Sequence, residues 1–437
     1  MRKFSFILTS SVAIMALAAG MSLITSCEGP AGLTGDEGAD ANETCKLCHN
    51  QSVVGQKMAE FKFSKHHYGE AAFEEAGSTG CAPCHASEGF KYVSENNIPA
   101  TFALNATTGK YSNSYSATSS TSYGEFSCAT CHSNLHNDYE FSDFYPLTTT
   151  APVAMNMWGG TKTIDVQSDS SSSNLCIKCH QPRPITTSST LSTGNVVNYA
   201  ALATNPTATF FAPGASTNVL LPSYRTGVHY GTAGAIYAGE GGVEFDGSLD
   251  YTNGTHTATA SCSDCHMAPI TGRAGGHTFV AKGNFNGCNT AECHGSAPLN
   301  ANSTKFKDTQ TAIKTLLNNL AGQLKTVDNI DILHKDSDAE SNLWASATTN
   351  KYDGYFDIYD PSTNPEGALR NPGPASSWTQ AQKDINLALP AFTLTNAEMG
   401  ALINFQMCLR DYSLGVHNYA YTRALLTNSL EALAASK

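Results

Sequence analysis

Six short segments, each carrying two cysteines and a following histidine, constrain this chain more than any other feature of its 437 residues. Five have the form C-x-x-C-H: Cys45/Cys48/His49, Cys81/Cys84/His85, Cys128/Cys131/His132, Cys176/Cys179/His180 and Cys262/Cys265/His266. The sixth has four residues between its cysteines, at Cys288/Cys293/His294. The C-x-x-C-H form is typical of c-type haem attachment, in which both thiols bind the haem covalently and the histidine binds its iron. The sequence therefore predicts six attached haems, each with one proximal histidine.

Two other kinds of site use paired cysteines. A single C-x-x-C-H segment could be half of a zinc site or a redox-active dithiol. Five repeats with the histidine always in the same place favour haem attachment over both. In the sixth segment the longer loop is unusual, which leaves a structural disulfide between Cys288 and Cys293 as the alternative there.

Eight of the 14 histidines lie outside these segments, which is enough to give every iron a second histidine. The expected distal ligands are His66, His67, His136, His229, His256, His277 and His417. His66 and His67 point apart on a regular backbone, so they serve two neighbouring haems or one of them is spare, with His66 favoured. His136 is expected on the same helix face as His132, within reach of an adjacent haem.

The N-terminus has the parts of an export signal. Basic Arg2 and Lys3 precede a run of apolar and small residues at 4–24. The signal then ends in L-I-T-S-C, whose last residue is Cys27. That junction resembles a bacterial lipobox, which implies removal of residues 1–26 and lipidation of Cys27. A plain secretory signal and an uncleaved membrane helix are the alternatives. Because Glu28 rather than Asp follows, we expect an exported protein anchored by lipid to the outer membrane, on its periplasmic or cell-surface face.

The segment after Cys27 reads as a tether over residues 27–44. Glycines recur in triplet register there, but four triplets are too few for a stable triple helix, so an extended spacer is favoured over trimerisation. No later run is long and apolar enough to span a membrane. The formal net charge of −12 disfavours nucleic acid as a partner. An acidic surface suits redox partners with basic docking patches, and a charge of this size is equally well explained as a solubility feature.

The remaining chain divides into a hexahaem region at 45–300 and a helical region at 301–437 that closes over the haems. We expect a mainly α fold with extensive irregular loops and few short strands, in which attached haems supply much of the core. Polar insertions at 101–127, 161–174 and 186–218 predict surface loops or short strands.

Three helices are predicted in the C-terminal region. Residues 311–327 carry an apolar stripe at helical spacing, and Thr395 with Glu398 forms a capping box ahead of a helix over 399–409. Asn418 is the expected cap of a last helix that runs to residue 433. Cys408 lies on an apolar helix face, which favours a buried core residue over a reactive thiol.

Two segments carry a family resemblance: C-S-D-C-H-M-A-P-I-T-G-R-A-G-G-H at 262–277 and G-V-H-N-Y-A-Y-T-R-A-L-L at 415–426. They resemble the multihaem cytochromes c of respiring Gram-negative bacteria, in the group that includes the ammonia-forming cytochrome c nitrite reductases. The resemblance implies that His417 is a distal haem ligand. In that family the catalytic haem is held by a C-x-x-C-K motif with an open coordination site, and this chain has no such motif. Haem count, length and export also resemble the hexahaem outer-surface cytochromes that form conductive filaments.

These features favour an electron-transfer protein over an enzyme. Bis-histidine haems would pass single electrons to other redox proteins, such as quinol-side or outer-membrane cytochromes, or to an extracellular acceptor, and no catalytic residue is expected. One alternative is a reductase of nitrogen or sulfur oxyanions with an open haem at Cys288/Cys293/His294. Another is a filament subunit, against which lipidation of Cys27 argues.

Overall fold

The computed structural model describes residues 45–68, 81–98, 102–105, 110–113, 124–155, 157–158, 162–168, 171–182, 199–210, 228–324, 332–336, 343, 351–356, 379–381 and 394–437. All six cysteine–histidine segments and all 14 histidines fall within these ranges. The expected signal peptide, Cys27 and the tether lie outside the described residues.

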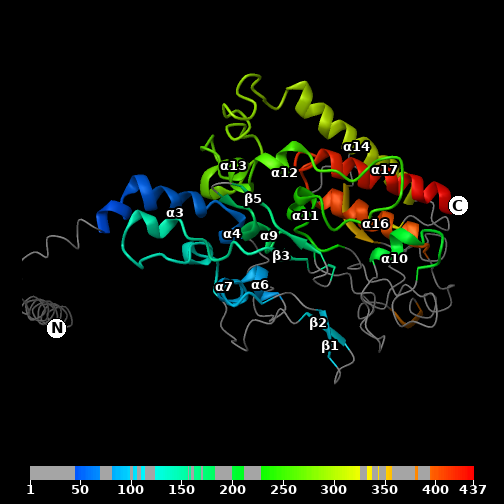
Figure 1. Cartoon of the computed structure of the whole chain (residues 1–437), viewed down its shortest axis with the longest axis horizontal. Helices are drawn as coiled ribbons and strands as arrows, with labels where there is room; N and C mark the ends of the chain where they lie inside the picture. Colours follow the sequence, from blue (N-terminus) through cyan, green and yellow to red (C-terminus); the bar gives the residue numbers. More distant parts are fainter. Residues whose placement is uncertain are drawn as a thin grey trace, which may run out of the picture.

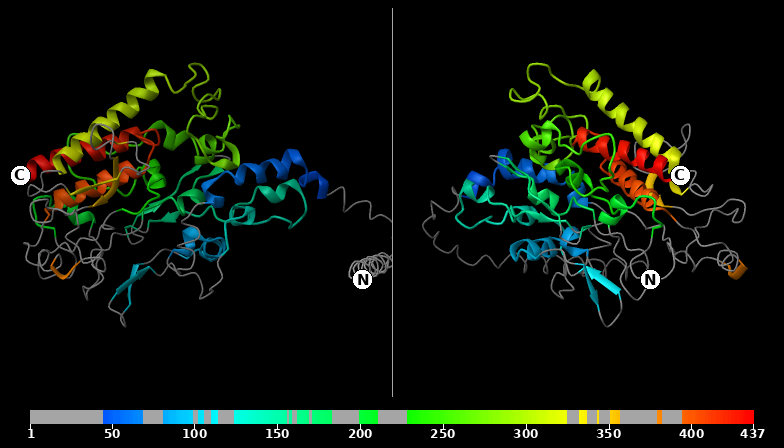
Figure 2. Two further views of the ribbon diagram at one scale, coloured as in Figure 1. Left: turned by 180° about the vertical axis from the view of Figure 1, so that it is seen from behind. Right: turned by 45° about the vertical axis from the view of Figure 1, so that its right-hand side comes forward.

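The chain forms a mainly helical structure with few short strands, as the sequence predicts. Its longest helices are α14 (Thr304–Leu324), α16 (Asn396–Arg410) and α17 (Tyr419–Ser436), which pack together on one side of the molecule (Figure 1). Helix α3 (Gln56–Phe61) extends away on the opposite side. Figure 2 shows the same three C-terminal helices as one layer from two further directions.

The other described elements are short. The helices are η1 (Gln51–Gly55), α4 (Lys65–Tyr68), α6 (Ala82–His85), α7 (Ser87–Glu95), α8 (Cys128–Cys131), η2 (Phe141–Phe144), α9 (Asn174–Ile177), α10 (Tyr199–Thr204), α11 (Ala233–Ala238), α12 (Thr255–Thr259), α13 (Cys262–His266) and η3 (Gly276–Thr278). Four antiparallel strand pairs accompany them: β1 (Phe102–Asn105) with β2 (Lys110–Asn113), β3 (Val153–Ala154) with β4 (Thr163–Ile164), β5 (Gln167–Ser168) with β6 (Ser171–Ser172), and β7 (Leu333–Asp336) with β8 (Lys351–Phe356).

Both predicted helix caps in the C-terminal region are confirmed. The Thr395 hydroxyl accepts from the Glu398 N–H at 3.1 Å, and the Glu398 carboxylate accepts from the Thr395 N–H at 2.7 Å. The Asn418 side chain likewise accepts from the Tyr421 N–H at 3.2 Å and caps α17. Each cap satisfies N–H groups that a helix start leaves without a helical partner.

Helix α14 begins at Thr304, earlier than the apolar stripe from residue 311 indicates. Apart from Phe306, its first residues are polar, and all of them are half-buried or exposed, so no periodic burial marks them. The stripe itself is correctly placed, because Ile313, Leu317 and Leu320 are fully buried. The helical face that they form packs against α16 and α17.

Helix α16 lies at the centre of this core. Phe405 and Cys408 are fully buried, which confirms Cys408 as a core residue. The buried Asn404 amide bonds both polar groups of the Val243 backbone, at 2.8 and 2.7 Å, and also the Ser429 hydroxyl at 2.9 Å. These bonds join α16 to α17 and to the extended 243–246 segment without leaving buried polar groups unpaired.

The polar insertions follow the prediction only in part. Strands β1, β2 and β4 to β6 lie within the first two insertions, as expected for short strands. The third insertion contributes helix α10 instead, and Leu202 and Phe210 in and after it are buried in the C-terminal core. The local sequence Y-A-A-L-A-T explains the difference, because alanine and leucine favour a helix that buries its apolar face. Within the described residues, no helix is long and apolar enough to cross a membrane.

Candidate functional site

The cysteine–histidine segments share one local backbone closure. In four of the C-x-x-C-H segments, the N–H of the histidine donates to the carbonyl of the first cysteine: His49 to Cys45 at 2.8 Å, His85 to Cys81 at 3.1 Å, His132 to Cys128 at 3.0 Å and His180 to Cys176 at 2.9 Å. The fifth segment is itself the short helix α13. This turn brings two thiols and an imidazole to one side of the backbone.

The sixth segment keeps the same closure despite its longer loop. The His294 N–H donates to the Cys288 carbonyl at 2.9 Å. The additional residues are accommodated in a turn in which Cys293 and Gly295 both donate to the Thr290 carbonyl, at 3.2 and 2.8 Å. The described cysteines form no disulfide with one another, so the alternative of a Cys288–Cys293 disulfide has no support in the structure.

The first segment lies outside the apolar core. Cys45 is exposed and Cys48 is half-buried, and the Cys48 carbonyl accepts from the Asn50 N–H at 2.9 Å. The following helix η1 buries none of its residues, because the segment lies on an arm that no long helix covers. Haem attachment through Cys45 and Cys48 stays a prediction from their spacing.

Each motif histidine faces one other histidine. The ring centres are 5.7 Å apart for His49 and His136, 6.3 Å for His85 and His229, 6.4 Å for His132 and His277, 6.0 Å for His180 and His66, 6.0 Å for His266 and His417, and 6.3 Å for His294 and His256. We number these pairs as sites 1 to 6 in the chain order of their motifs. Two imidazoles that bind opposite sides of one metal ion, each about 2 Å from it, have ring centres about 6 Å apart.

The pairing assigns the remaining histidines. Six of the seven predicted distal ligands each lie opposite a different motif histidine, whereas His67 packs against the Phe61 ring at 5.4 Å. The sequence analysis favoured His66 over its neighbour, and the structure brings His66 to His180. His334 lies opposite none of the motif histidines in the described pairs, and its Nδ1 bonds the Asp353 carboxylate.

His136 reaches its partner by a different backbone route from the one predicted. A helix continuing from His132 was expected, but residues 133–136 form a turn and His136 has a φ of 64°. Its Nε2 lies 3.4 Å from Nε2 of His49, and its ring also stacks on Tyr139. The helix prediction was therefore wrong at this point, because the turn, and not helical spacing, directs the His136 ring.

Several ring nitrogens that do not face a partner histidine are held by the protein. Nδ1 of His266 lies 2.9 Å from the Phe279 carbonyl, and Nδ1 of His256 lies 2.9 Å from the Val416 carbonyl. Because a carbonyl only accepts, Nδ1 must carry the proton in both rings. Nε2 then keeps its lone pair, which is the arrangement a metal-ligating histidine requires.

Desolvation by the surrounding protein favours the neutral form of several of these imidazoles. Together with the neighbouring His66 and His266, it lowers the pKa of His180 to about 4. Burial also lowers the pKa of His66 and His132 below the usual histidine range. Neutral imidazole is the form that binds a metal ion, so these sites are poised to ligate near neutral pH.

Site 4 lies at the junction of the others. The Cys84 Sγ is 3.9 Å from the Lys178 carbonyl, and the Cys179 Sγ is 3.8 Å from the Pro83 carbonyl, so the motifs of sites 2 and 4 touch. The side chains of Cys176 and Cys262 share a hydrogen bond, which joins sites 4 and 5. Cys131 of site 3 is also an electrostatic neighbour of the site 4 cysteines.

Phe279 connects three of these sites. Its ring centre lies 4.9 Å from that of His66 and 5.8 Å from that of His277, and its carbonyl holds His266. Phe279 adopts a φ of 57°, a conformation that is uncommon for an aromatic residue. Sites 3, 4 and 5 are thus in contact with one residue that no motif indicated.

Glycine allows close packing behind site 4. Gly234 donates its N–H to the His180 carbonyl at 2.9 Å, and a Cβ there would lie 2.5 Å from the same oxygen. Any larger residue would push α11 away from α9 and displace His180. Gly234 is therefore a structural determinant of site 4, although no sequence motif pointed to it.

Helix α16 holds the distal histidine of site 2. Gln406 accepts from the Val228 N–H at 3.0 Å, and Thr232 donates to the Met407 carbonyl at 2.9 Å. Arg410 donates to the Val228 carbonyl. His229 lies between these anchored positions, so the last turns of α16 fix the backbone that carries it.

The distal histidine of site 5 has a carboxylate partner. Nδ1 of His417 lies 2.5 Å from the Asp411 carboxylate, and Ser413 donates to the same carboxylate and accepts from the His417 N–H. Burial alone would lower the pKa of His417, but the buried Asp411 carboxylate raises it above its usual value. A carboxylate on Nδ1 makes the imidazole a stronger electron donor at Nε2.

Asp411→Asn is therefore expected to raise the reduction potential of an iron bound at site 5. A hydrogen bond to a charged group contributes about 1.5–3 kcal/mol, which for one electron corresponds to about 60–130 mV. Potentiometric titration with optical detection measures the shift. Glu431→Gln is the matched control, because the Glu431 carboxylate bonds Ser248 and no histidine. Equal effects from both substitutions would contradict the role given to Asp411.

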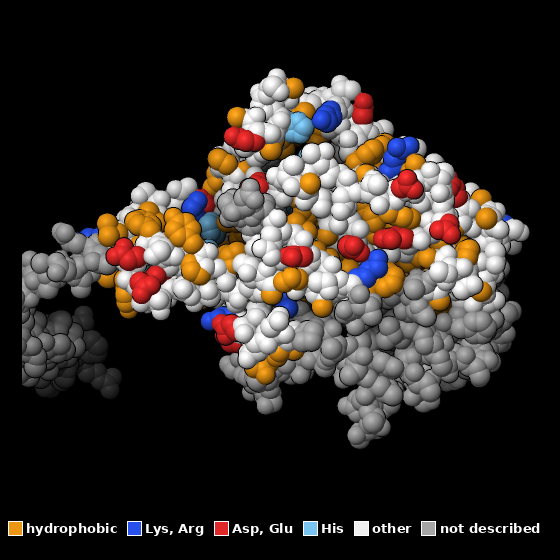
Figure 3. Space-filling view, in the orientation of Figure 1, with side chains coloured by type: hydrophobic (Ala, Val, Ile, Leu, Met, Phe, Trp, Pro, Cys, Tyr) orange, Lys and Arg blue, Asp and Glu red, His pale blue; other side chains and the backbone are white. Residues whose placement is uncertain are grey.

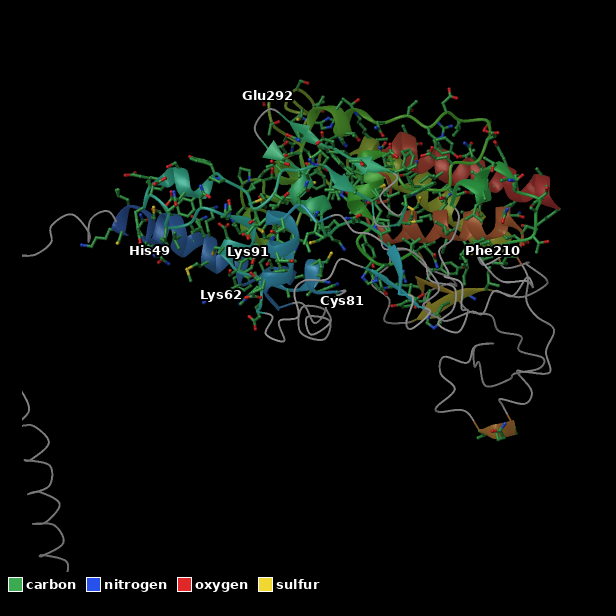
Figure 4. All side chains as sticks on the ribbon, turned by 60° about the horizontal axis from the view of Figure 1, so that its bottom comes forward. His49, Lys62, Cys81, Lys91, Phe210 and Glu292 are labelled. Carbon is green, nitrogen blue, oxygen red and sulfur yellow. The ribbon has the colours of Figure 1, made fainter. Side chains whose placement is uncertain are left out.

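The sites are spread along the molecule. Figure 4 shows His49 of site 1 at one end, Cys81 of site 2 near the middle and Glu292 of the site 6 loop apart from both. The arm that carries site 1 exposes apolar side chains (Figure 3). Leu47, two positions before His49, and Tyr139, which stacks on His136, are both exposed. Exposed apolar groups around a ligand pair suit a large, flat, apolar cofactor.

Each of the six sites brings two histidines together. Within the described residues, no three His, Cys, Asp or Glu side chains converge to hold a metal ion. A porphyrin supplies four nitrogen ligands of its own, so a pair of histidines completes its iron. No protein-family model, curated protein or solved structure matches the chain.

Proposed function

We propose that the chain is a hexahaem c-type cytochrome that passes single electrons through its haems. The observation that carries this proposal is the pairing of all six motif histidines with six different histidines, at ring-centre separations of 5.7–6.4 Å. Each haem iron, when bound, supplies a one-electron couple. The paired histidines would hold the iron, and hydrogen bonds at Nδ1 orient the imidazoles of His256, His266 and His417.

The chemistry of the thiols disfavours the redox-dithiol alternative. Burial raises the pKa of Cys131 and of Cys265 to about 11. Reactive thiols of redox motifs have lowered pKa values, because the thiolate is the nucleophile. Cys262, which accepts from the Cys176 thiol, is the exception among the shifted thiols of the described segments, with a pKa lowered to about 6. Covalent attachment to a haem needs two thiols beside the histidine. It does not need either of them to remain a stable thiolate.

The arrangement supports a branched route for electrons. Sites 2, 3 and 5 all adjoin site 4, and Cys265 of site 5 is an electrostatic neighbour of Cys288 and Cys293 of site 6. Site 1 adjoins site 3, because its distal His136 follows His132 closely in the chain. Electrons entering at site 1, 2 or 6 would therefore reach the other two ends through site 4.

The reductase alternative needs one iron with an open position. The sequence analysis put that position at Cys288/Cys293/His294, but His256 lies opposite His294 there as in the other sites. Among the described residues, each of the six motif histidines has another histidine opposite it. This pairing favours electron transfer over substrate reduction.

The proposed setting follows from the N-terminal sequence. Lipidation of Cys27 would anchor the protein to the outer membrane, on its periplasmic or cell-surface face, where other redox proteins or an extracellular acceptor would exchange electrons with it. We do not expect nucleic acid as a partner. A tethered N-terminus also restrains head-to-tail stacking into a filament.

The mature protein is expected to carry six covalently bound haems, all low-spin. Intact-mass measurement gives the haem number, and low-temperature electron paramagnetic resonance gives the spin states. Five haems would mean that one segment attaches no haem. Cys48→Ser and Cys293→Ser then show whether it is the first or the sixth segment, because a substitution in the segment without haem leaves the haem number unchanged. A high-spin signal that changes on addition of nitrite would favour the reductase.

A further inference from the structure

Arg410, the last residue of α16, is a buried cation with an unusual set of partners. It is 3% exposed. Its guanidinium donates to the Val228 carbonyl and, at 3.3 Å, to the Asp353 carbonyl. The rings of Tyr230 and Tyr355 lie against the guanidinium, with their centres 4.2 and 4.7 Å from its central carbon. Two carbonyls and two aromatic faces thus surround the charge.

No carboxylate of the described residues balances this charge. The nearby Asp353 carboxylate accepts from the Tyr355 N–H at 2.7 Å and bonds Nδ1 of His334. The neighbouring Asp411 carboxylate bonds His417 and Ser413. Nη2 of Arg410 is buried and has no hydrogen-bond partner among the described residues. A buried charge with an unused donor is strongly unfavourable unless an anion completes it.

The place of this donor indicates which anion. Val228 and Tyr230, both held by Arg410, flank the site 2 distal ligand His229 in the chain. The Tyr230 and His229 ring centres are 6.1 Å apart, and His229 in turn faces His85 at 6.3 Å. A haem carries two propionate carboxylates on its edge, within reach of side chains that border its axial histidine.

We propose that Arg410 binds a carboxylate at site 2, namely a propionate of the haem held by His85 and His229. This inference rests on the proposed function. A planar guanidinium presents paired donors that match a carboxylate, and the two tyrosine rings lie against the guanidinium. A positive charge so close to the haem disfavours loss of an electron, so Arg410 raises the potential of this haem relative to one with an unpaired propionate.

Arg410→Gln in the intact six-haem protein tests the proposal. We expect one haem to shift to a lower potential and the other five to keep theirs in a potentiometric titration. The shifted haem is identified as site 2 by comparison with His229→Ala, which should make that haem high-spin. Arg410→Lys, which keeps the charge, should restore most of the lost potential. No shift in any haem, or a shift in a different haem, would overturn the proposal.

Two further measurements separate the remaining explanations. Titration of the wild-type protein with acetate should leave the site 2 potential unchanged, and a saturable change that Arg410→Gln abolishes would mean that the carboxylate comes from solution. Intact mass shows whether each variant has six haems, so failure of the proposed function is seen independently.

If Arg410→Gln lacks haem, wild-type protein with ¹⁵N-labelled arginine is examined by redox-difference infrared spectroscopy. An isotope-sensitive guanidinium band that follows the site 2 potential is expected, and its absence would contradict the pairing.

Discussion

Replacing His66 by alanine is expected to convert one low-spin haem of six to high spin while leaving all six haems attached. His66 lies opposite His180 at site 4, with ring centres 6.0 Å apart, and the Cys176 and Cys179 thiols do not depend on it for attachment. Loss of one histidine ligand should raise the reduction potential of site 4. Because site 4 adjoins sites 2, 3 and 5, electron exchange among sites 1, 2 and 6 should slow. Electron paramagnetic resonance reports the spin state, and stopped-flow reduction reports the exchange.

His67→Ala is the matched control for this experiment. The two histidines are adjacent in α4, but His67 packs on Phe61 and lies opposite no motif histidine in the described pairs. All haems of this variant should remain low-spin. If His67→Ala gave the high-spin signal and His66→Ala did not, the site 4 pairing would be wrong.

Phe405→Ala is expected to lower the free energy of unfolding of the C-terminal helical layer by about 3–5 kcal/mol, because removal of a buried aromatic ring loses its transfer free energy and leaves a cavity. Phe405 is fully buried in α16, and its ring meets that of Tyr352 edge-on at 5.6 Å. Urea unfolding followed by far-ultraviolet circular dichroism measures the change.

Phe405→Leu separates lost volume from lost packing at the same position. Leucine keeps most of the buried apolar surface, so the expected loss is below about 1.5 kcal/mol. Equal losses for both substitutions would show that the aromatic contact with Tyr352, rather than the filled volume, holds this part of the core.

Local signals in the sequence located much of this architecture. The caps at Thr395 and Asn418 and the burial of Cys408 were predictable, because each depends on residues within one or two turns of a helix. The start of α14 was missed for the same reason, since polar first-turn residues carry no periodic burial. Helix α10 was missed because the insertion around it is polar on average.

The pairing of histidines could not be read from the sequence in the same way. His49 and His136 are 87 positions apart, and the other pairs are also brought together by the folded chain and not by local spacing. Counting singled out seven candidate histidines, six of which the fold brings opposite motif histidines, but it did not indicate which would pair. The roles of four further residues depend on what the tertiary fold places beside them, so the sequence did not reveal them: Gly234, Phe279, Arg410 and Asp411.

The end of α16 has an electrical consequence for the whole molecule. Two successive residues there carry opposite charges toward different haem sites: Arg410 toward site 2 and Asp411 toward His417 of site 5. In the proposed cytochrome, the positive charge would raise the reduction potential of site 2 and the carboxylate would lower that of site 5. Two neighbouring positions at the end of one helix would thus hold the two potentials apart. Electrons that leave site 5 would then move through site 4 to the higher reduction potential of site 2. The end of α16 would thus give electron transfer between these sites a preferred direction.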